Sequence, residues 1–280
     1  MTTRALLLTA VLIGSTRALL AAGVAPPANP VLAAADAAWA RRAEDRSGAR
    51  ASARRISEAV ARYEEAAKDP DAVEPRWKLA RALFFEAKFT GLDRDAQRAL
   101  LEKARRAGEE AIAILGRRSA AVPANADAAP AYFWTAVAWG EWGQIVSRAR
   151  AAKAGTASKI RDYSTKVIAL DPEFEEGGGY RVLGRLHDRA PRIPLVTGWV
   201  SRKEALRNLR SAVRVAPRNF VNRHFLAEAL ARGTPAEKAE AIRIERELVA
   251  EPPTPERLVE DLAIQEDAMR DLTAWTGRPS

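Results

Sequence analysis

One spacing recurs along this 280-residue sequence: an alanine, a bulky residue four positions later, a second alanine three positions on, and then a proline. It occurs over 205–217 and again over 59–70, where the gap before the proline is one residue shorter. Nine residues after each proline, at Leu79 and Leu226, a Leu-Ala-x-x-Leu segment begins in the same register. Small residues at a helix crossing allow close approach, and bulky ones fill the space beside it, so the spacing predicts repeated pairs of packed helices.

A third copy lies between these two. Leu183-Gly184-x-x-His187 matches the first helix of such a pair and follows the segment 168–172, which ends in proline. Three copies that agree in pattern and register are typical of tetratricopeptide (TPR) repeats. We therefore expect an all-α fold, a TPR-like helical repeat that forms an α–α superhelix.

One repeat is longer than the others. Leu183 and Leu226 are 43 positions apart, whereas an uninterrupted TPR repeats every ~34 residues. The additional residues fall in the proline-containing segment 190–198. Inserts in helical repeats often lie on the working rim, so this loop is either part of a binding surface or a neutral surface loop.

Helical periodicity with short Pro and Gly punctuation predicts the element order. The expected helices are 36–46, 52–68, 74–90, 94–116, 129–151, 157–170, 179–189, 202–215, 220–232, 235–249 and 256–274. No stretch sustains period-two alternation, so we expect essentially no strand. The repeat domain is assigned to 36–255, and 256–280 to a C-terminal capping helix and tail.

The composition excludes several classes of site. The chain has no cysteine and two histidines, His187 and His224, which removes cysteine-ligated zinc, thiol catalysis and a histidine-rich metal centre. The net charge is +9, but the basic residues are interleaved with acidic ones and not clustered as nucleic-acid binding requires. The run Gly177–Gly179 follows a helix and not a strand, so it predicts a turn and not a phosphate loop. We expect no enzyme, no cofactor, no metal and no nucleic-acid partner.

The N-terminus has the order of a secretory signal: Arg4, an apolar run over 5–14, and then small residues. We predict a signal peptide over 1–35. A nearer cut around Ala22 and an uncleaved membrane anchor are the alternatives. A span needs about 20 apolar residues, and Arg17 would lie inside it.

Four further segments carry a family resemblance: Trp39-x-x-Arg42, the aromatic run 131–142, the segment 170–184, and the Ala-Pro-x-x-Pro insert at 190–194. The most specific is the Gly-Gly-x-Arg-x-Leu-Gly element at the end of 170–184. In their order, these segments resemble the T component of TPR-protein-associated TRAP transporters, the TatT family. The resemblance covers roughly residues 36–250.

The resemblance implies a periplasmic accessory protein of a solute importer, with a pore or groove that holds apolar organic acids. It also implies a partner, the importer's extracytoplasmic solute-binding protein. Family members are often lipoproteins, but this chain has no cysteine to carry a lipid, so we expect a periplasmic protein without one. A homo-oligomer stays open. The alternative function is a generic TPR interaction scaffold in the cell envelope.

The TPR register also predicts which side chains face the groove. These are Trp77, Arg81, Arg181, Arg185, His224 and Glu228. Trp134, Trp139 and Trp142 form an aromatic stripe that is either an apolar pore wall or helix-packing core. Arg181 and Arg185, one helical turn apart, are expected to clamp a carboxylate together, unless they pair with the acidic residues at 173–176.

Overall fold

The computed structural model describes residues 29–118, 126–194 and 196–277, and this part of the chain is all-helical. The helices are α1 (Pro30–Ala40), α2 (Ala53–Ala66), α3 (Glu74–Phe89), α4 (Arg94–Arg117), α5 (Ala128–Ile145), α6 (Arg148–Lys153), α7 (Thr156–Leu170), α8 (Phe174–Arg189), α9 (Arg202–Val215), α10 (Phe220–Ala231), α11 (Pro235–Ala250) and α12 (Leu258–Thr276), with a 3-10 turn, η1 (Pro255–Arg257), before α12. The described residues contain no strand, only an isolated bridge between Ser47 and Arg50. The predicted all-α class is confirmed.

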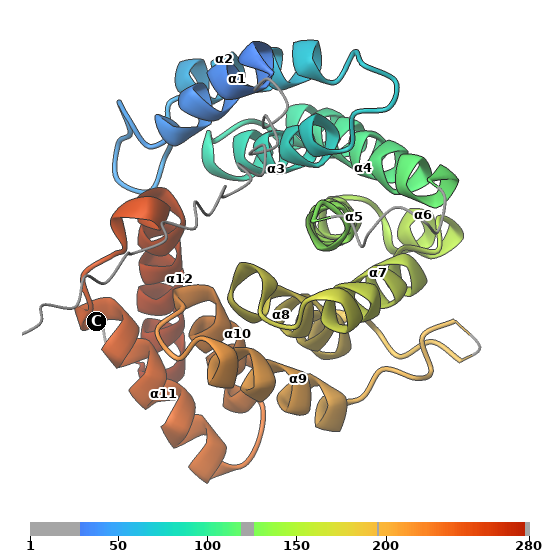
Figure 1. Cartoon of the computed structure of the whole chain (residues 1–280). Coiled ribbons are helices and arrows are strands. Elements are labelled where there is room, and N and C mark those ends of the chain that lie inside the picture. Colours follow the sequence, from blue (N-terminus) through green and yellow to red (C-terminus); the bar gives the residue numbers. More distant parts are fainter. Residues whose placement is uncertain (1–28, 119–125, 195, 278–280) are drawn as a thin grey trace, which may run out of the picture.

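The helices form a ring of two layers (Figure 1). Helices α3, α5, α8, α10 and α12 contact one another in that order and make the inner layer. Helices α2, α4, α7, α9 and α11 pack against them from outside. Each inner helix is followed or preceded by an outer one, so the chain advances around the ring as a series of helical hairpins.

The end of the chain returns to its beginning, where α12 lies beside the segment that follows α1 (Figure 1). Arg42 joins the two parts. Its Nη2 lies 3.1 Å from Oε1 of Glu260 on α12 and also donates to the main-chain carbonyl of Glu256. The guanidinium is stacked over Trp39, 4.5 Å from the ring centre, so one side chain holds both sides of the closure.

The first helix differs from the prediction of 36–46. It begins at Pro30 because Asn29 caps it: the Asn29 side chain accepts bonds from the amides of Val31 and Leu32. Proline is tolerated in a first turn, where its missing N–H would be unbonded anyway. Ala35 is fully buried in α1, so a cut after this residue would divide a packed helix. The rest of the predicted signal, residues 1–28, lies outside the described residues.

Two other boundaries were wrong. The predicted helix 129–151 is two helices, because Val146 is extended and Ser147 caps α6. The predicted helix 179–189 begins earlier, at Phe174, through an irregular first turn. Among the described residues, no helix combines the length and apolar character needed to span a bilayer.

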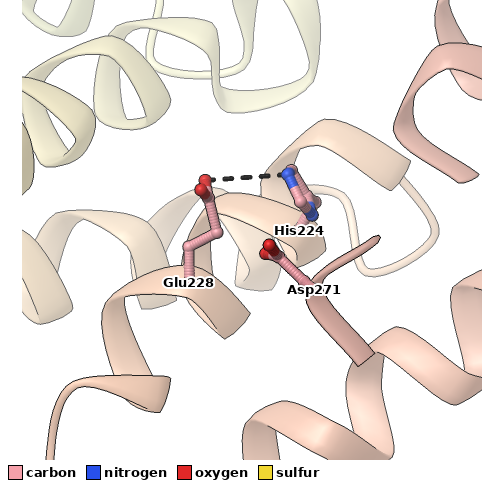
Figure 2. Close-up of side chains that lie close together, drawn as sticks. All are labelled: His224, Glu228 and Asp271. Atoms are coloured by element: carbon pink, nitrogen blue, oxygen red, sulfur yellow. Dashed lines mark ion pairs between the residues drawn. The ribbon is translucent and has the colours of Figure 1, made fainter. Parts of the chain in front are cut away.

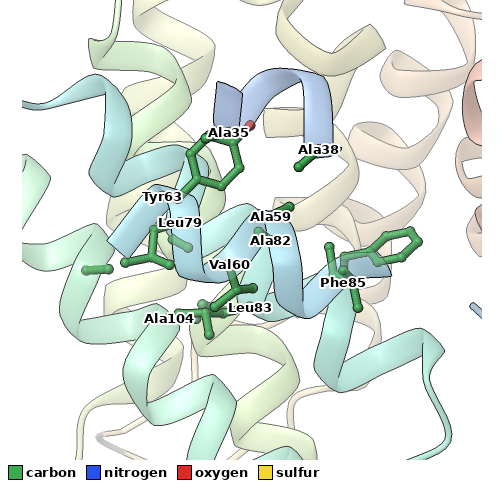
Figure 3. Packing of buried hydrophobic residues seen from close by; sticks show 14 of the residues in the cluster. Ala35, Ala38, Ala59, Val60, Tyr63, Leu79, Ala82, Leu83, Phe85 and Ala104 are labelled. Atoms are coloured by element: carbon green, nitrogen blue, oxygen red, sulfur yellow. The ribbon is translucent and has the colours of Figure 1, made fainter. Parts of the chain in front are cut away.

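The repeated alanines are buried at helix crossings, as predicted. Ala59, Ala205 and Ala212 have no exposed surface, and Ala66 is 5% exposed. Figure 3 shows Ala59 among the apolar side chains that join the first three helices. On the far side of the ring, a methyl group added to Gly177 would lie 3.1 Å from Cα of Ala212. The small residues therefore let α8 and α9 approach to backbone contact.

Candidate functional site

A cavity of about 720 Å³ lies inside the ring. All five inner helices contribute to its lining, together with Trp39 and Arg42 near the closure. The insert contributes as well, through residues that include Ile193 and Thr197. The cavity is therefore built from segments distributed over most of the described chain.

One side of the cavity is an aromatic wall, which consists of Trp39, Phe84, Phe85, Phe89, Phe133 and Trp134. Each ring touches the next. Trp39 meets Phe85 with ring centres 5.5 Å apart, and Phe133 meets Trp134 at 4.9 Å. Edge-on and tilted contacts of this kind hold aromatic rings in fixed orientations. The wall joins α1, α3 and α5 into one continuous apolar surface.

Arg81 stands beside this wall and has no carboxylate partner within salt-bridge distance among the described residues. Its guanidinium is stacked over Trp39 at 4.1 Å, and its Nη2 donates to the Tyr63 hydroxyl at 3.3 Å. Burial lowers the pKa of Arg81 below its ordinary value. An arginine stays charged at neutral pH in proteins, so α3 presents a desolvated cation at the aromatic wall.

Arg181, from α8, is the second such cation. Its Nη1 donates to the side-chain oxygen of Asn222 at 2.8 Å and to the main-chain oxygen of Glu175 at 3.1 Å. No carboxylate lies within 4.0 Å of it among the described residues. Burial lowers the pKa of Arg181 to about 10, which leaves it charged at neutral pH. Its guanidinium lies 5.7 Å from the ring centre of Phe133.

An irregular turn places Arg181. Glu175, Glu176 and Gly177 all have left-handed backbone angles, with φ of 48°, 57° and 80°. Such angles cost non-glycine residues of order 1–3 kcal/mol and persist only when the surroundings hold them. Here Asn222 donates to the Glu176 carbonyl at 2.9 Å. The strained turn and the arginine therefore share one buried asparagine.

The charges on the lining are not balanced. Its described acidic side chains are Glu141, Glu175, Glu228, Glu260, Asp267 and Asp271. Its described basic side chains are Arg42, Arg81, Lys88, Arg148, Arg181, Arg185, Arg189, Arg257 and Arg270. Glu175 is the carboxylate whose charge acts on both Arg81 and Arg181, and it partly offsets the effect of burial on their pKa values. The aromatic side of the cavity thus combines two unpaired guanidiniums with one nearby carboxylate.

The opposite side is polar and paired. Glu228 on α10 accepts from Arg185 and Arg189 of α8. Its pKa is lowered, because these arginines and His224 outweigh the opposing effect of burial. The Nε2 atom of His224 lies 3.6 Å from Glu228 Oε2. Figure 2 shows these two side chains converging with Asp271 of α12.

Six of the nine side chains predicted for the groove line the cavity: Arg81, Trp134, Arg181, Arg185, His224 and Glu228. Arg181 and Arg185 do not form the predicted open clamp. Arg185 is paired with Glu228, whereas Arg181 is bonded to Asn222 and to a main-chain carbonyl. The alternative pairing with the carboxylates at 173–176 is also not what holds them. The arginine that shares the aromatic side with Arg181 is Arg81.

Trp77, Trp139 and Trp142 do not belong to the cavity lining. Trp139 and Trp142 lie on the face of α5 that packs on the outer helices, against Leu101 and Ile160. They enclose Arg105, whose guanidinium carbon is 3.7 and 3.9 Å from the two ring centres.

Trp77 packs toward α4 and donates to Asp127 at 3.0 Å. For Trp139 and Trp142 this is the helix-packing alternative, and Trp77 likewise does not line the cavity. A helix turns about 100° per residue, so the position of a residue along the helix decides which face it occupies. The positions of these tryptophans direct their side chains toward neighbouring helices and away from the cavity.

Sequence reasoning missed several lining residues. Phe84, Phe85 and Phe89 line the cavity from α3, and three phenylalanines within six residues, out of seven in the chain, were a signal that could have been used. Asp271, which also lines the cavity, and Asn222, which holds the lining residue Arg181, had no such signal, because their partners are distant in sequence.

No protein-family model matches the chain, and none of the curated proteins matches it.

Proposed function

We propose that this chain is a ring of TPR-type hairpins that binds one small molecule, apolar along its body and anionic at one end, in its central cavity. The single observation that carries the proposal is the pairing of the aromatic wall with half-buried Arg81 and buried Arg181, two guanidiniums that lack carboxylate partners among the described residues. The cavity volume of about 720 Å³ is within the range of small-molecule sites.

An anionic ligand would compensate the positive charge of Arg81 and Arg181. A buried cation is costly when no anion offsets it, and hydrogen bonds from arginine to a carboxylate are stronger than those between neutral groups. A ligand carboxylate near Arg81 and Arg181 would supply that missing charge. The apolar body of the ligand would cover the aromatic wall, and removal of that surface from water favours binding by roughly 25 cal/mol per Å².

The biological role that we propose is that of a T component of a TRAP-type importer. The ring would hold an organic acid in the periplasm and exchange it with the importer's solute-binding protein. This part rests on the resemblance of the motifs, and the central cavity with its aromatic wall is compatible with it. Genes for a solute-binding protein and for membrane subunits beside this one would support the role. Their absence would favour the generic envelope scaffold.

Calorimetric titration with a matched pair of ligands tests the binding proposal. The pair is decanoate and decanol, which share an apolar chain and differ in the charged end. We expect decanoate to bind and decanol to bind more weakly, because only decanoate can accept charge-assisted bonds. Arg81→Gln should weaken decanoate binding by about 10-fold or more, since a hydrogen bond to a charged group contributes about 1.5–3 kcal/mol.

Arg148→Gln is the matched control. Arg148 also lines the cavity but is exposed, so its removal changes the net charge equally without touching the aromatic wall. Its decanoate affinity should stay near that of the wild type. Equal binding of decanoate and decanol, or equal losses in the two variants, would contradict the proposed site. Absence of any binding would favour the scaffold function.

A further inference from the structure

The polar side of the cavity carries a second cluster that the proposed function does not use. One ligand-type atom from each of His224, Glu228 and Asp271 lies within 4.8 Å of the others. The residues come from α10 and α12, and they converge in Figure 2. All three line the cavity, so a species dissolved in it can reach them.

The histidine is held in a defined orientation from behind. Nδ1 of His224 lies 2.9 Å from Oε1 of Glu245 on α11, and Glu245 is fully buried. This leaves Nε2 as the nitrogen toward Glu228. A carboxylate on one nitrogen of an imidazole fixes the tautomer and raises the basicity of the other, an arrangement typical of metal-binding histidines.

Asp271 has no hydrogen bond or ion pair among the described residues to offset its charge. Its carboxylate is therefore available to a cation in the cavity, whereas Glu228 is paired with Arg185 and Arg189.

We propose that His224, Glu228 and Asp271 bind a divalent transition-metal cation of the Zn²⁺ and Co²⁺ type. One imidazole nitrogen with carboxylate oxygens suits these ions. Three protein ligands leave a fourth position open, and here it would face the cavity. The arginines do not block Glu228, because each carboxylate oxygen has two acceptor positions. The metal site is independent of the proposed function.

Titration of the chelator-treated full chain with Co²⁺ alone tests this site. Visible absorption reports the coordination, and equilibrium dialysis gives the affinity. We expect one Co²⁺ per chain. Asp271→Asn and His224→Gln should each weaken binding by at least about tenfold, and Glu245→Gln by about 10- to 100-fold, as is usual when a partner behind a ligand is removed.

Asp267→Asn is the control, since Asp267 lines the same cavity but is paired with Arg270; its affinity should be unchanged. Far-UV circular dichroism checks that each variant is folded. If the wild type binds no more Co²⁺ than Asp271→Asn, or if Asp267→Asn loses as much affinity, the metal site is refuted. The decanoate titration, run with a chelator present, gives its result separately, so failure of one proposal leaves the other standing.

Discussion

Replacement of Asn222 by alanine tests how the cavity is held in shape. Asn222 has no exposed surface. Its amide donates to the carbonyls of Glu176 and Ala212 at 2.9 and 3.0 Å, and its oxygen accepts from Arg181 at 2.8 Å. One small side chain therefore ties the strained turn of α8 to α9 and orients a cavity arginine.

The expected loss in the free energy of unfolding follows from these three hydrogen bonds. A hydrogen bond to a charged group contributes about 1.5–3 kcal/mol and a neutral one about 0.5–1.5 kcal/mol. With one bond of the first kind and two of the second, Asn222→Ala should lower the free energy of unfolding by about 2.5–6 kcal/mol. Asn208→Ala is the control. Asn208 is also buried, at 4% exposed, but makes one bond, to Glu204 in its own helix, and should cost about 1 kcal/mol.

Urea unfolding followed by far-UV circular dichroism measures both changes, from the shift in midpoint at a common slope. Asn222→Ala should also weaken decanoate binding, because Arg181 loses the bond that orients it. If Asn222→Ala is no more destabilising than Asn208→Ala, the asparagine does not hold the turn, and this account of how Arg181 is placed is wrong.

Three further expectations follow from the fold. Ala212→Leu should lower the melting temperature, since overpacking costs about 1–3 kcal/mol and Gly177 leaves no room opposite; an unchanged value would refute the close crossing. Burial alone would raise the pKa of Glu176, but bonds to Arg257 and Asn219 lower it below its ordinary value of 4.5. The stabilisation of the fold by ionised Glu176 is therefore complete above pH 4.5 and is lost as the pH falls through the lowered pKa. The destabilisation caused by Glu176→Gln should accordingly shrink in unfolding curves recorded at acidic pH. Mass spectrometry of the protein from its native host should show cleavage upstream of Asn29, because α1 is packed; an intact terminus in a membrane fraction would favour an anchor.

The sequence was most informative about features that depend on residues close together in the chain. Helix periodicity and proline stops located most of the helices, and the Ala59 and Ala205 spacings identified helix crossings that are buried in the structure. The TPR register also placed Arg81, Arg181 and His224 on inner helices, because position within a repeat determines which face a residue occupies.

Prediction failed where the outcome depends on distant partners. Trp139 and Trp142 could have faced either layer, and the packing of α4 and α7 around α5 decides between them. Pairing of Arg185 with Glu228 joins residues 43 positions apart. Asp271 approaches His224 because α12 packs on α10, and nothing in the local sequence of α12 signals that packing.

Closure of the ring also explains why the expected groove is a central cavity lined from several sides. An open array would leave the aromatic wall facing solvent along one side. In this structure, Arg42 bridges to α12 and its guanidinium covers Trp39. The C-terminal helix is therefore part of the cavity lining, through Ile264 and its neighbours.

The most direct test of the central claim is a crystal structure of the protein with decanoate that carries bromine at its terminal carbon, located by anomalous scattering. The account predicts the carboxylate within hydrogen-bonding distance of Arg81 or Arg181, with the bromine inside the cavity against the aromatic wall. A bromine position outside the ring, or a carboxylate bound away from both arginines, would contradict it.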